Sequence, residues 1–244
     1  MRCAIEILGV PVDIVDHRAT LDKLELFMRE GGYHLFVTPN PEMIMMAQKD
    51  AHIMEILCSA ALAAPDGIGV LLASRLMKKP VPERVAGSDI IPDLLERMSK
   101  NGRTAYFLGG RPGVAERARQ NMESRYPGIK IIGARHGYFS DDDDKLITGE
   151  LSAKKPDLLV LGLSMGLALN WAHDHRHLNI PVSACVGGTL DILAGTVKRA
   201  PVFFRKTGLE WFYRLISQPS RAGRMLRLPV FAAAVLRERF MPRP

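Results

Sequence analysis

Four short turns in the sequence carry residues suited to ligand binding and acid–base chemistry. Each turn follows a run of apolar residues that predicts a buried strand. Two turns hold polar side chains and two are rich in glycine; they read Thr38-Pro39-Asn40, Pro65-Asp66-Gly67, Gly109-Gly110-Arg111 and Gly187-Gly188-Thr189. In an open parallel sheet the ligand crevice forms beyond the carboxyl ends of the strands, so we expect these turns to line one edge of a sheet.

The first two turns would bring a hydroxyl, an amide and a carboxylate together if their strands are neighbours. The carboxylate of Asp66 is then a candidate general base. The glycine turns offer backbone N–H groups at helix starts, which suit a diphosphate. Taken singly, Asn40 is explained as a helix cap and the glycine pairs as ordinary turns between strand and helix. The place of Asp66 between Pro65 and Gly67 favours contact with a substrate as much as it favours a cap.

Other patterns argue against alternative chemistries. The stretch from Gly110 to Gly113 lacks the full G-x-G-x-x-G fingerprint, which argues against a dehydrogenase. The histidines His173, His175 and His177 could share a helix face as metal ligands, but an exposed polar helix surface is the expected structure. The four aspartates at 141–144 predict a solvated helix start, because negative charge is favourable there.

Strand and helix patterns alternate along most of the chain. Strands are predicted over residues 4–10, 34–38, 60–64, 104–108, 130–134, 158–163 and 182–186. Helices are predicted from Thr20, over 43–57 and 68–77, from Ser88, over 114–126, from Asp141 and over 167–177. Nearly all-apolar strands joined by helices predict an α/β fold with a Rossmann-like, doubly wound, mainly parallel sheet, followed by a helical basic appendage.

The positive charge of the protein is concentrated at its C-terminal end. The whole chain has a formal charge of +7, yet from Lys198 onward eleven basic residues face only two acidic ones. The rest of the chain is slightly acidic. We therefore divide the sequence into an α/β core over residues 1–197 and a basic appendage over residues 198–244 whose partner is an anionic surface.

The appendage mixes its basic residues with many aliphatic and aromatic ones. This mixture predicts a pair of interfacial helices, with Pro229 able to start the second. The residues predicted to face an anionic membrane are Arg205, Lys206, Arg214, Arg221, Arg224 and Arg227. Two alternatives are packing of the apolar residues on the core and binding of nucleic acid. Aliphatic side chains cannot stack on bases, so we expect no nucleic-acid partner.

Cysteine usage and the N-terminus predict a cytoplasmic protein. The three cysteines, Cys3, Cys58 and Cys185, have unrelated spacings and are expected to be reduced core thiols. The N-terminus looks like a first strand and not like a signal peptide. No apolar run approaches the length of about 18 residues that a spanning helix needs, so the expected location is peripheral, on the inner face of the cell membrane.

Read together, these motifs resemble the WecG/TagA/CpsF family of bacterial glycosyltransferases, glycosyltransferase family 26. The resemblance covers most of the chain. Its ordered motifs are Thr38-Pro39-Asn40-Pro41-Glu42, Ala64-Pro65-Asp66-Gly67-Ile68-Gly69, Glu83-Arg84-Val85-Ala86-Gly87-Ser88-Asp89, Phe107-Leu108-Gly109-Gly110, His136-Gly137-Tyr138-Phe139, the stretch 187–195, and Arg199-Ala200-Pro201 leading to Gly208-Leu209-Glu210-Trp211.

The resemblance implies an inverting, metal-independent enzyme without a cofactor. Members of the family move a sugar from a UDP donor to a polyprenyl-diphosphate-linked sugar in the synthesis of surface polysaccharides and exopolysaccharides. By this resemblance Asp66 is the base, Thr38 and Asn40 lie beside it, and Arg84 neutralises the departing diphosphate. The donor is expected at Gly109, Gly110, Arg111, Tyr138, Gly187, Gly188 and Asp191.

One motif departs from the family. After the strand ending at Leu163, members usually carry Gly-x-Pro-x-Gln-Glu, whereas this chain has Ala168 and Leu169 at the Gln and Glu positions. The donor sugar is therefore left open between an N-acetylmannosamine type and a glucose type. A catalytically inactive protein that binds sugar nucleotides or assists polysaccharide assembly is the alternative. The acceptor sugar, the polymer and the oligomeric state, a homo-oligomer included, are also left open.

Overall fold

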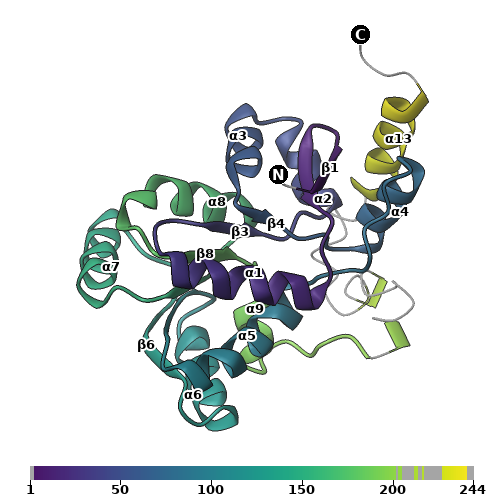
Figure 1. Ribbon diagram of the computed structural model, residues 1–244. Coiled ribbons are helices and arrows are strands. Elements are labelled where there is room, and N and C mark those ends of the chain that lie inside the picture. Colours follow the sequence, from purple (N-terminus) through teal and green to yellow (C-terminus); the bar gives the residue numbers. More distant parts are fainter. Residues whose placement is uncertain (1–2, 202, 205–211, 214–215, 217–226, 241–244) are drawn as a thin grey trace.

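A six-stranded parallel sheet forms the centre of the molecule, as the sequence predicts. The computed structural model describes residues 3–201, 203–204, 212–213, 216 and 227–240 (Figure 1). The strands are β3 (Leu35–Val37), β4 (Leu62–Ala63), β5 (Thr104–Gly109), β6 (Lys130–Arg135), β7 (Leu158–Gly162) and β8 (Val182–Cys185). Their spatial order is β4-β3-β8-β7-β5-β6, so β8 lies between the preceding strand β7 and the first strand of the sheet, β3.

The strand register aligns the carboxyl ends of the sheet. Val37 of β3 lies opposite Ala63 of β4 and Cys185 of β8. Cys185 in turn lies opposite Leu161 of β7, which pairs with Leu108 of β5. Every turn that the sequence singled out therefore begins at the same edge of the sheet.

Helices cover both faces of the sheet, which makes the fold a doubly wound α/β fold (Figure 1). One face packs against α1 (His17–Glu30), α5 (Gly87–Asn101), α6 (Val114–Arg125) and α9 (Thr189–Leu193). The other packs against α3 (Ala51–Ser59), α7 (Asp141–Lys154) and α8 (Met165–Asp174). Successive strand side chains alternate between the two layers, so Phe36 packs in one layer while Leu35 and Val37 pack in the other.

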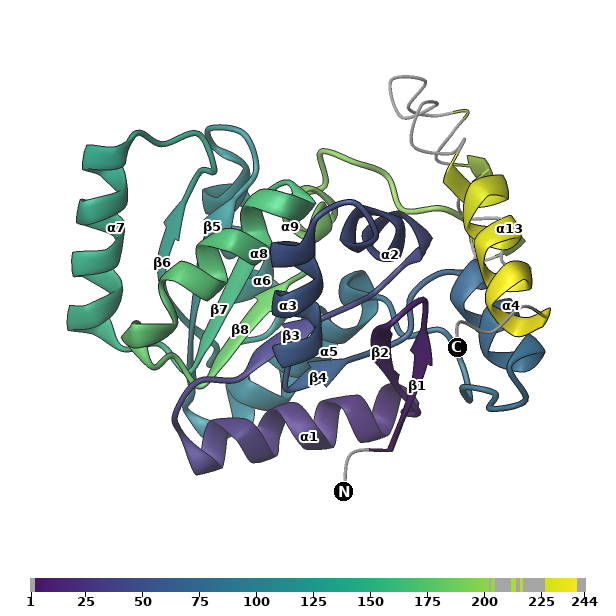
Figure 2. The same ribbon diagram turned by 90° about the horizontal axis from the view of Figure 1, so that it is seen from above.

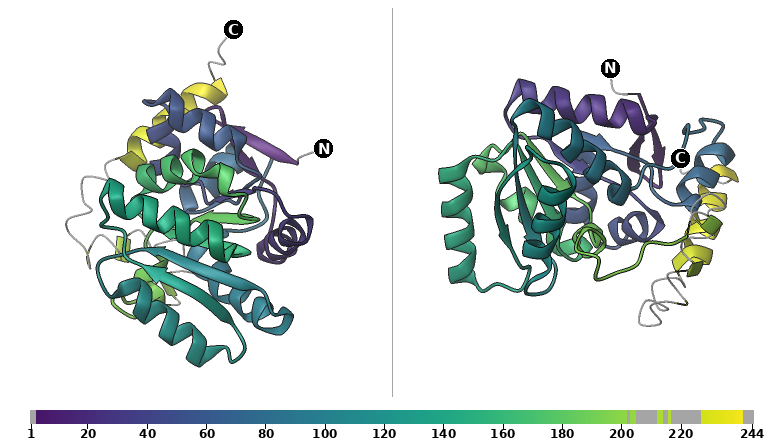
Figure 3. Two further views of the ribbon diagram at one scale, coloured as in Figure 1. Left: turned by 90° about the vertical axis from the view of Figure 1, so that its left-hand side faces the viewer. Right: turned by 90° about the horizontal axis from the view of Figure 1, so that it is seen from below.

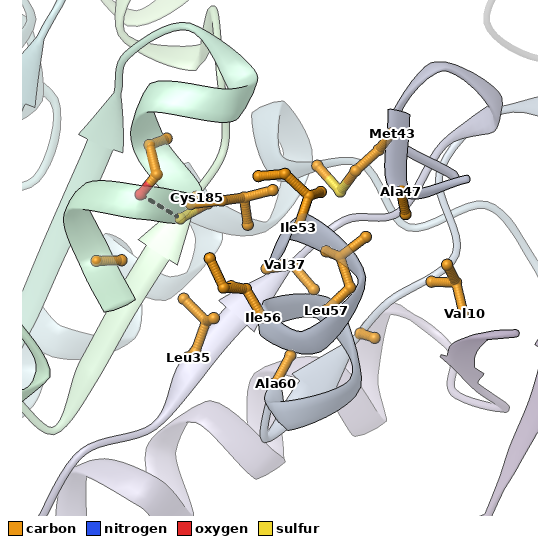
Figure 4. Close-up of a cluster of buried hydrophobic side chains, with 14 of the residues drawn as sticks. Val10, Leu35, Val37, Met43, Ala47, Ile53, Ile56, Leu57, Ala60 and Cys185 are labelled. Carbon is orange, nitrogen blue, oxygen red and sulfur yellow. Dashed lines mark hydrogen bonds between the residues drawn. The ribbon is translucent and has the colours of Figure 1, made fainter. Parts of the chain in front are cut away.

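The layer around α3 is shown in Figure 4. Ile53, Ile56 and Leu57 of α3 are almost completely buried against Leu35 and Val37 of β3. The same cluster includes Cys185, whose thiol donates to the carbonyl of Ala168 over 3.4 Å. Burial raises the pKa of the Cys185 thiol to about 12, so this cysteine is an inert core residue. The expectation of core thiols is wrong for Cys3 and Cys58, which are exposed.

The first predicted strand is in fact a hairpin. Residues 4–10 were expected to be continuous, but β1 (Ala4–Ile7) turns into the antiparallel β2 (Val10–Asp13). Leu8 and Gly9 have φ angles of 51° and 78°, the positive pair typical of a two-residue hairpin turn. The buried carboxylate of Asp13 accepts the Ala63 N–H over 2.7 Å and so ties the hairpin to the edge strand β4.

Two predicted helix boundaries are wrong because nearby aspartates cap the helices. α1 begins before Thr20, with Asp16 accepting the Ala19 N–H. The helix predicted over 43–57 is two helices, α2 (Pro41–Ala47) and α3, because Asp50 caps a new start. Ser88 was expected to cap a helix, but it lies inside α5, whose N-cap residue Ala86 makes no side-chain bond.

Of the predicted pair of helices, the second, near Pro229, is present as α13 (Arg227–Phe240) and packs on the core, while most of the first lies outside the described residues. It lies beside α2 and α4 (Ile68–Leu76), at the end of the molecule away from α7 (Figures 2 and 3). Phe231 and Val235 are buried there. The Leu8 N–H donates to the Glu238 carboxylate over 3.0 Å, so α13 also holds the turn of the hairpin. None of the described helices is long and apolar enough to cross a membrane.

Candidate active site

The ends of β3 and β4 bring Thr38, Asn40 and Asp66 to adjoining loops, as predicted. The Asp66 N–H donates to the Pro39 carbonyl over 3.0 Å, which continues the pairing of the two strands into their loops. Asn40 caps α2 by accepting the Met43 N–H over 3.0 Å. Thr38 is buried. The backbone therefore fixes the position from which the Asp66 side chain extends.

A chain of alternating charges leads away from Asp66. The Arg84 guanidinium lies 3.3 Å from the Asp66 carboxylate and 3.7 Å from that of Asp89. Asp89, in the first turn of α5, also pairs with Arg199. The loop that carries Arg84 is held in place by the Val85 N–H, which donates to the Pro65 carbonyl over 2.7 Å.

The Asp66–Arg84 ion pair is partly shielded from solvent. Only 18% of the Arg84 side chain and 27% of the Asp66 side chain are exposed, so their attraction is screened less than that of a surface pair. An ionised carboxylate can accept a proton, and a guanidinium shared between two carboxylates can also meet a phosphate. The pair is thus equipped for proton transfer beside a developing anion.

Sequence reasoning found Asp66 and Arg84 but not the roles of Asp89 and Arg199 as their ion-pair partners. Arg199 is remote in sequence from Asp89, and no local pattern links them. The sequence indicated these two residues only in one way: both lie within the motifs that resemble the glycosyltransferase family.

The glycine turns form a second part of the same edge. Gly109 has a φ of 146°, and a Cβ atom there would lie 2.4 Å from the backbone of Gly162. The Gly137 N–H donates to the Gly110 carbonyl over 2.8 Å, which lays the loop after β6 across the end of β5. Arg111 is exposed, and so is Tyr138, with 67% of its surface accessible. Both side chains are available to a ligand.

The turn after β8 completes this edge. Gly187 has a φ of 52°, and Gly188 leads directly into α9. The Asp191 carbonyl accepts the N–H groups of Thr196 and Val197, which closes the turn behind α9. The predicted donor residues thus come from the ends of β5, β6 and β8, while the predicted catalytic residues come from β3, β4 and the loop before α5.

Comparison with known proteins identifies the family. The model of the Glycosyl transferase WecG/TagA/CpsF family matches residues 5–244. The chain belongs to this family. Relatives from three species carry the name N-acetylglucosaminyldiphosphoundecaprenol N-acetyl-beta-D-mannosaminyltransferase.

The relative from Bacillus spizizenii is 34% identical, over 96% of this chain and 92% of its own length. The relative from Bacillus subtilis is 36% identical, over 85% of this chain and 82% of its own length. The relative from Staphylococcus aureus strain MW2 is 31% identical, over 93% of this chain and 90% of its own length.

The positions that depart from the family motif are part of the core. Ala168 and Leu169 are 1% and 0% exposed, and both pack in the layer that contains α3 and α8. Toward the start of α8, a Cβ atom on Gly166 would lie 3.7 Å from the Met46 sulfur. In this member of the family, α2 and the start of α8 therefore meet through small and apolar groups.

Of the three histidines, His177 is exposed as expected, whereas His173 and His175 are half-buried. His175 stacks on Trp171, and its ring nitrogen lies 3.1 Å from the Asp144 carboxylate. The same carboxylate accepts the Trp171 indole N–H over 2.6 Å. This cluster joins α7 to α8. Within the described residues no group of three or more ligand side chains is placed to hold a metal ion.

The residues predicted to face a membrane are largely beyond what the structure describes. Arg205, Lys206, Arg214, Arg221 and Arg224 lie outside the described residues, and for Arg227 the structure describes only its place in the helix α13. The described part of the appendage does present apolar side chains to solvent: Val230, Leu236 and Phe240 are 56%, 47% and 70% exposed.

Proposed function

We propose that this family member transfers a sugar from a UDP donor to a polyprenyl-diphosphate-linked sugar, with inversion at the anomeric carbon and without a metal ion. The names of its relatives describe transfer of N-acetylmannosamine to an undecaprenyl-diphosphate-linked N-acetylglucosamine. The similarity covers most of this chain and most of each relative, which supports a related reaction here. The transferred sugar is of the N-acetylmannosamine or the glucose type. The product serves the synthesis of a surface polysaccharide or exopolysaccharide.

The Asp66–Arg84 pair is the observation that carries this proposal. Asp66 removes the proton from the acceptor hydroxyl as that oxygen attacks the anomeric carbon. The bond between this carbon and the UDP oxygen breaks on the opposite face, and UDP leaves with the bonding electrons. Arg84 then turns from its two carboxylates toward the diphosphate and stabilises the charge that develops on it.

The glycine turns support a donor site at the same edge of the sheet. Backbone N–H groups of Gly187 and Gly188 suit the diphosphate, and Gly109 and Gly110 would let the diphosphate approach the backbone closely because they have no side chains. The Gly110 N–H itself donates to the Gly162 carbonyl over 3.1 Å. Arg111 and Tyr138 would contact the donor from the rim, and Asp191 would hold the turn beside it.

The surface of α13 supports a peripheral location on the inner face of the cell membrane. Pro229, Ala233, Leu236 and Phe240 follow one another at helical spacing and are all exposed, so α13 has an apolar stripe opposite its buried Phe231. A helix of this kind lies in the interface of a bilayer, and the basic residues of the appendage would add attraction to anionic lipid. The acceptor is confined to the same bilayer.

The reaction is tested with a panel of UDP-sugars and a polyprenyl-diphosphate-linked acceptor. We expect donor-selective release of UDP, lost by at least about 100-fold in Asp66→Asn, because the amide cannot take the proton. Asp142→Asn is the matched control, since that carboxylate is exposed and pairs only with Lys145 in the described part of the chain. Full activity of Asp66→Asn would show the mechanism to be wrong. Binding of a UDP-sugar without turnover by any donor would favour the inactive alternative.

A further inference from the structure

A groove between α5, α6 and α9 has the properties of a second ligand site. Its volume is about 530 Å³, within the range of small-molecule sites. The lining residues come from α5, α6, α9 and the segment after α9: Ser88, Pro92, Asn121, Met122, Ser124, Arg125, Ile192, Leu193 and Arg199. None of them belongs to the predicted catalytic or donor set, and none is acidic.

Ser88 provides an almost buried polar group in this groove. Only 7% of Ser88 is exposed, and in the described part of the chain its hydroxyl makes no hydrogen bond. Its carbonyl is also deprived of the usual helical donor, because the residue four positions later is Pro92, which has no N–H. The hydroxyl can donate or accept and the carbonyl can accept, so both atoms can bond to a ligand that carries hydroxyl groups.

Two arginines give the groove a positive charge. Arg125 is exposed on α6, with its guanidinium 5.1 Å from the centre of the Tyr126 ring. Arg199 reaches the groove from the other side while it pairs with Asp89. Guanidinium groups bind phosphate well, because their N–H donors match its oxygens. The Asn121 amide donates to the Leu193 carbonyl over 2.8 Å and so fixes α6 against α9, the two helices that flank this charge.

We propose that the groove between α5, α6 and α9 binds a sugar phosphate, a small molecule with both hydroxyl and phosphate groups. The phosphate lies between Arg125 and Arg199, and the sugar hydroxyls reach the Ser88 hydroxyl and carbonyl over the apolar floor of Met122 and Leu193. This binding does not depend on the proposed transferase activity.

The test is a titration followed by NMR of methionine methyl groups labelled with ¹³C. The methyl of Met122 reports on the groove, and that of Met43, whose N–H is bonded to Asn40, reports on the candidate active site. Glucose 1-phosphate is the probe, with glucose and inorganic phosphate as its two halves. We expect a saturable shift of the Met122 signal with glucose 1-phosphate and weaker effects of either half.

Variants distinguish binding in the groove from non-specific electrostatic attraction of the probe. Arg125→Gln and Ser88→Ala should each weaken the binding seen at Met122 by at least about fivefold, as expected for loss of one hydrogen bond to the ligand. Arg119→Gln and Ser99→Ala are matched controls on the same helices, since Arg119 pairs with Glu123 and Ser99 donates to the Glu96 carbonyl. The proposal is overturned if Met122 does not respond, if only Met43 responds, if inorganic phosphate binds as well as the probe, or if the controls weaken binding as much as the groove variants.

Discussion

The carboxylate of Glu150 is held by three neighbouring side chains. It accepts hydrogen bonds from Tyr106 of β5 and Arg135 of β6, which join α7 to the sheet, and from Lys154 of α7 itself. Burial by itself would raise the pKa of Glu150, but these hydrogen bonds outweigh it and lower the pKa to about 2. A carboxyl with a depressed pKa stabilises the fold above its ordinary pKa, and this stabilisation is lost as the pH falls toward 2.

Replacing Glu150 by Gln should therefore destabilise the protein in a pH-dependent way. We expect a loss of about 1 to 2 kcal/mol of unfolding free energy at pH 7, because the carboxylate is still partly solvated, and a smaller loss near pH 3. Urea unfolding at the two pH values measures this. Glu55→Gln, on the exposed side of α3, should change little at either pH. An equal loss at both values would contradict the electrostatic explanation.

Arg84 is the residue whose charge the proposed mechanism needs most after Asp66. Arg84→Gln should lower kcat by about 100-fold or more, the usual effect of removing a group that stabilises transition-state charge. Steady-state kinetics with the best donor measures the change. Arg97→Gln removes a guanidinium that pairs with Asp22 and Glu25 and should leave kcat unchanged. Wild-type turnover in Arg84→Gln would exclude the role proposed for this residue.

The sequence predicts the role of a residue where the pattern that marks this role lies within a few neighbouring residues. Asn40-Pro41-Glu42 predicted the cap of α2, because each residue type suits its place at a helix start. Ser88 has the right type for a cap but lies one position inside α5, where Gly87 packs against Val186 of the turn after β8. Tertiary packing decided that boundary, and the sequence around it does not show the contact.

Gly109 lets the end of β5 lie close to the end of β7 because it has no side chain. Gly109→Ala should lower the unfolding free energy by more than about 3 kcal/mol or prevent folding, because the new Cβ would overlap the backbone of Gly162. Gly113→Ala shares the positive φ, but nothing lies within 4 Å of its Cβ position, so it should cost only about 1 to 2 kcal/mol. Thermal and urea unfolding compare the two variants, and equal losses would show that backbone strain and not close approach dominates.

The secondary structure of most elements was predictable, but the pairing of strands was not. Apolar runs bounded by glycine, proline and capping residues place β3 to β8 close to their true bounds. The hairpin was missed because Leu8 in its turn is apolar and extends the apolar run of β1, where hairpin turns usually carry Asn or Asp before glycine. The position of β8 between β3 and β7 depends on contacts across more than 100 residues, for which a single sequence carries no periodic signal.

In the whole molecule, α13 has one side buried against the core and an apolar side exposed to solvent. Its buried side holds the helix against α2 and α4, and its outer apolar stripe is exposed. If α13 lies in the bilayer interface as proposed, Leu236→Asp and Phe240→Asp should each weaken binding to anionic vesicles by about tenfold or more, because each puts a charge on the apolar stripe that would contact lipid. Vesicle co-sedimentation measures this.

Controls for the vesicle experiment come from elsewhere on the surface. Leu146→Asp changes a side chain that is 62% exposed on α7 and should leave vesicle binding unaltered. Hydrogen exchange of α13 should be unchanged in Leu236→Asp and in Phe240→Asp, since the buried Phe231 and Val235 are intact. Equal binding by all three variants would place the membrane contact elsewhere.

The position of β8 also has a consequence for how the protein acquires its structure. Val182–Cys185 pairs with β3 on one side and β7 on the other, and it is the last strand of this sheet to be synthesised. Until it inserts, β4-β3 and β7-β5-β6 are separate sheets, each with an open edge. The step that joins them must close a long loop, so it is expected to be slow. Asp66 stands on one half, and the glycine turn after β5 stands on the other. A chain that has not passed this step therefore holds both parts of the candidate site without having assembled it.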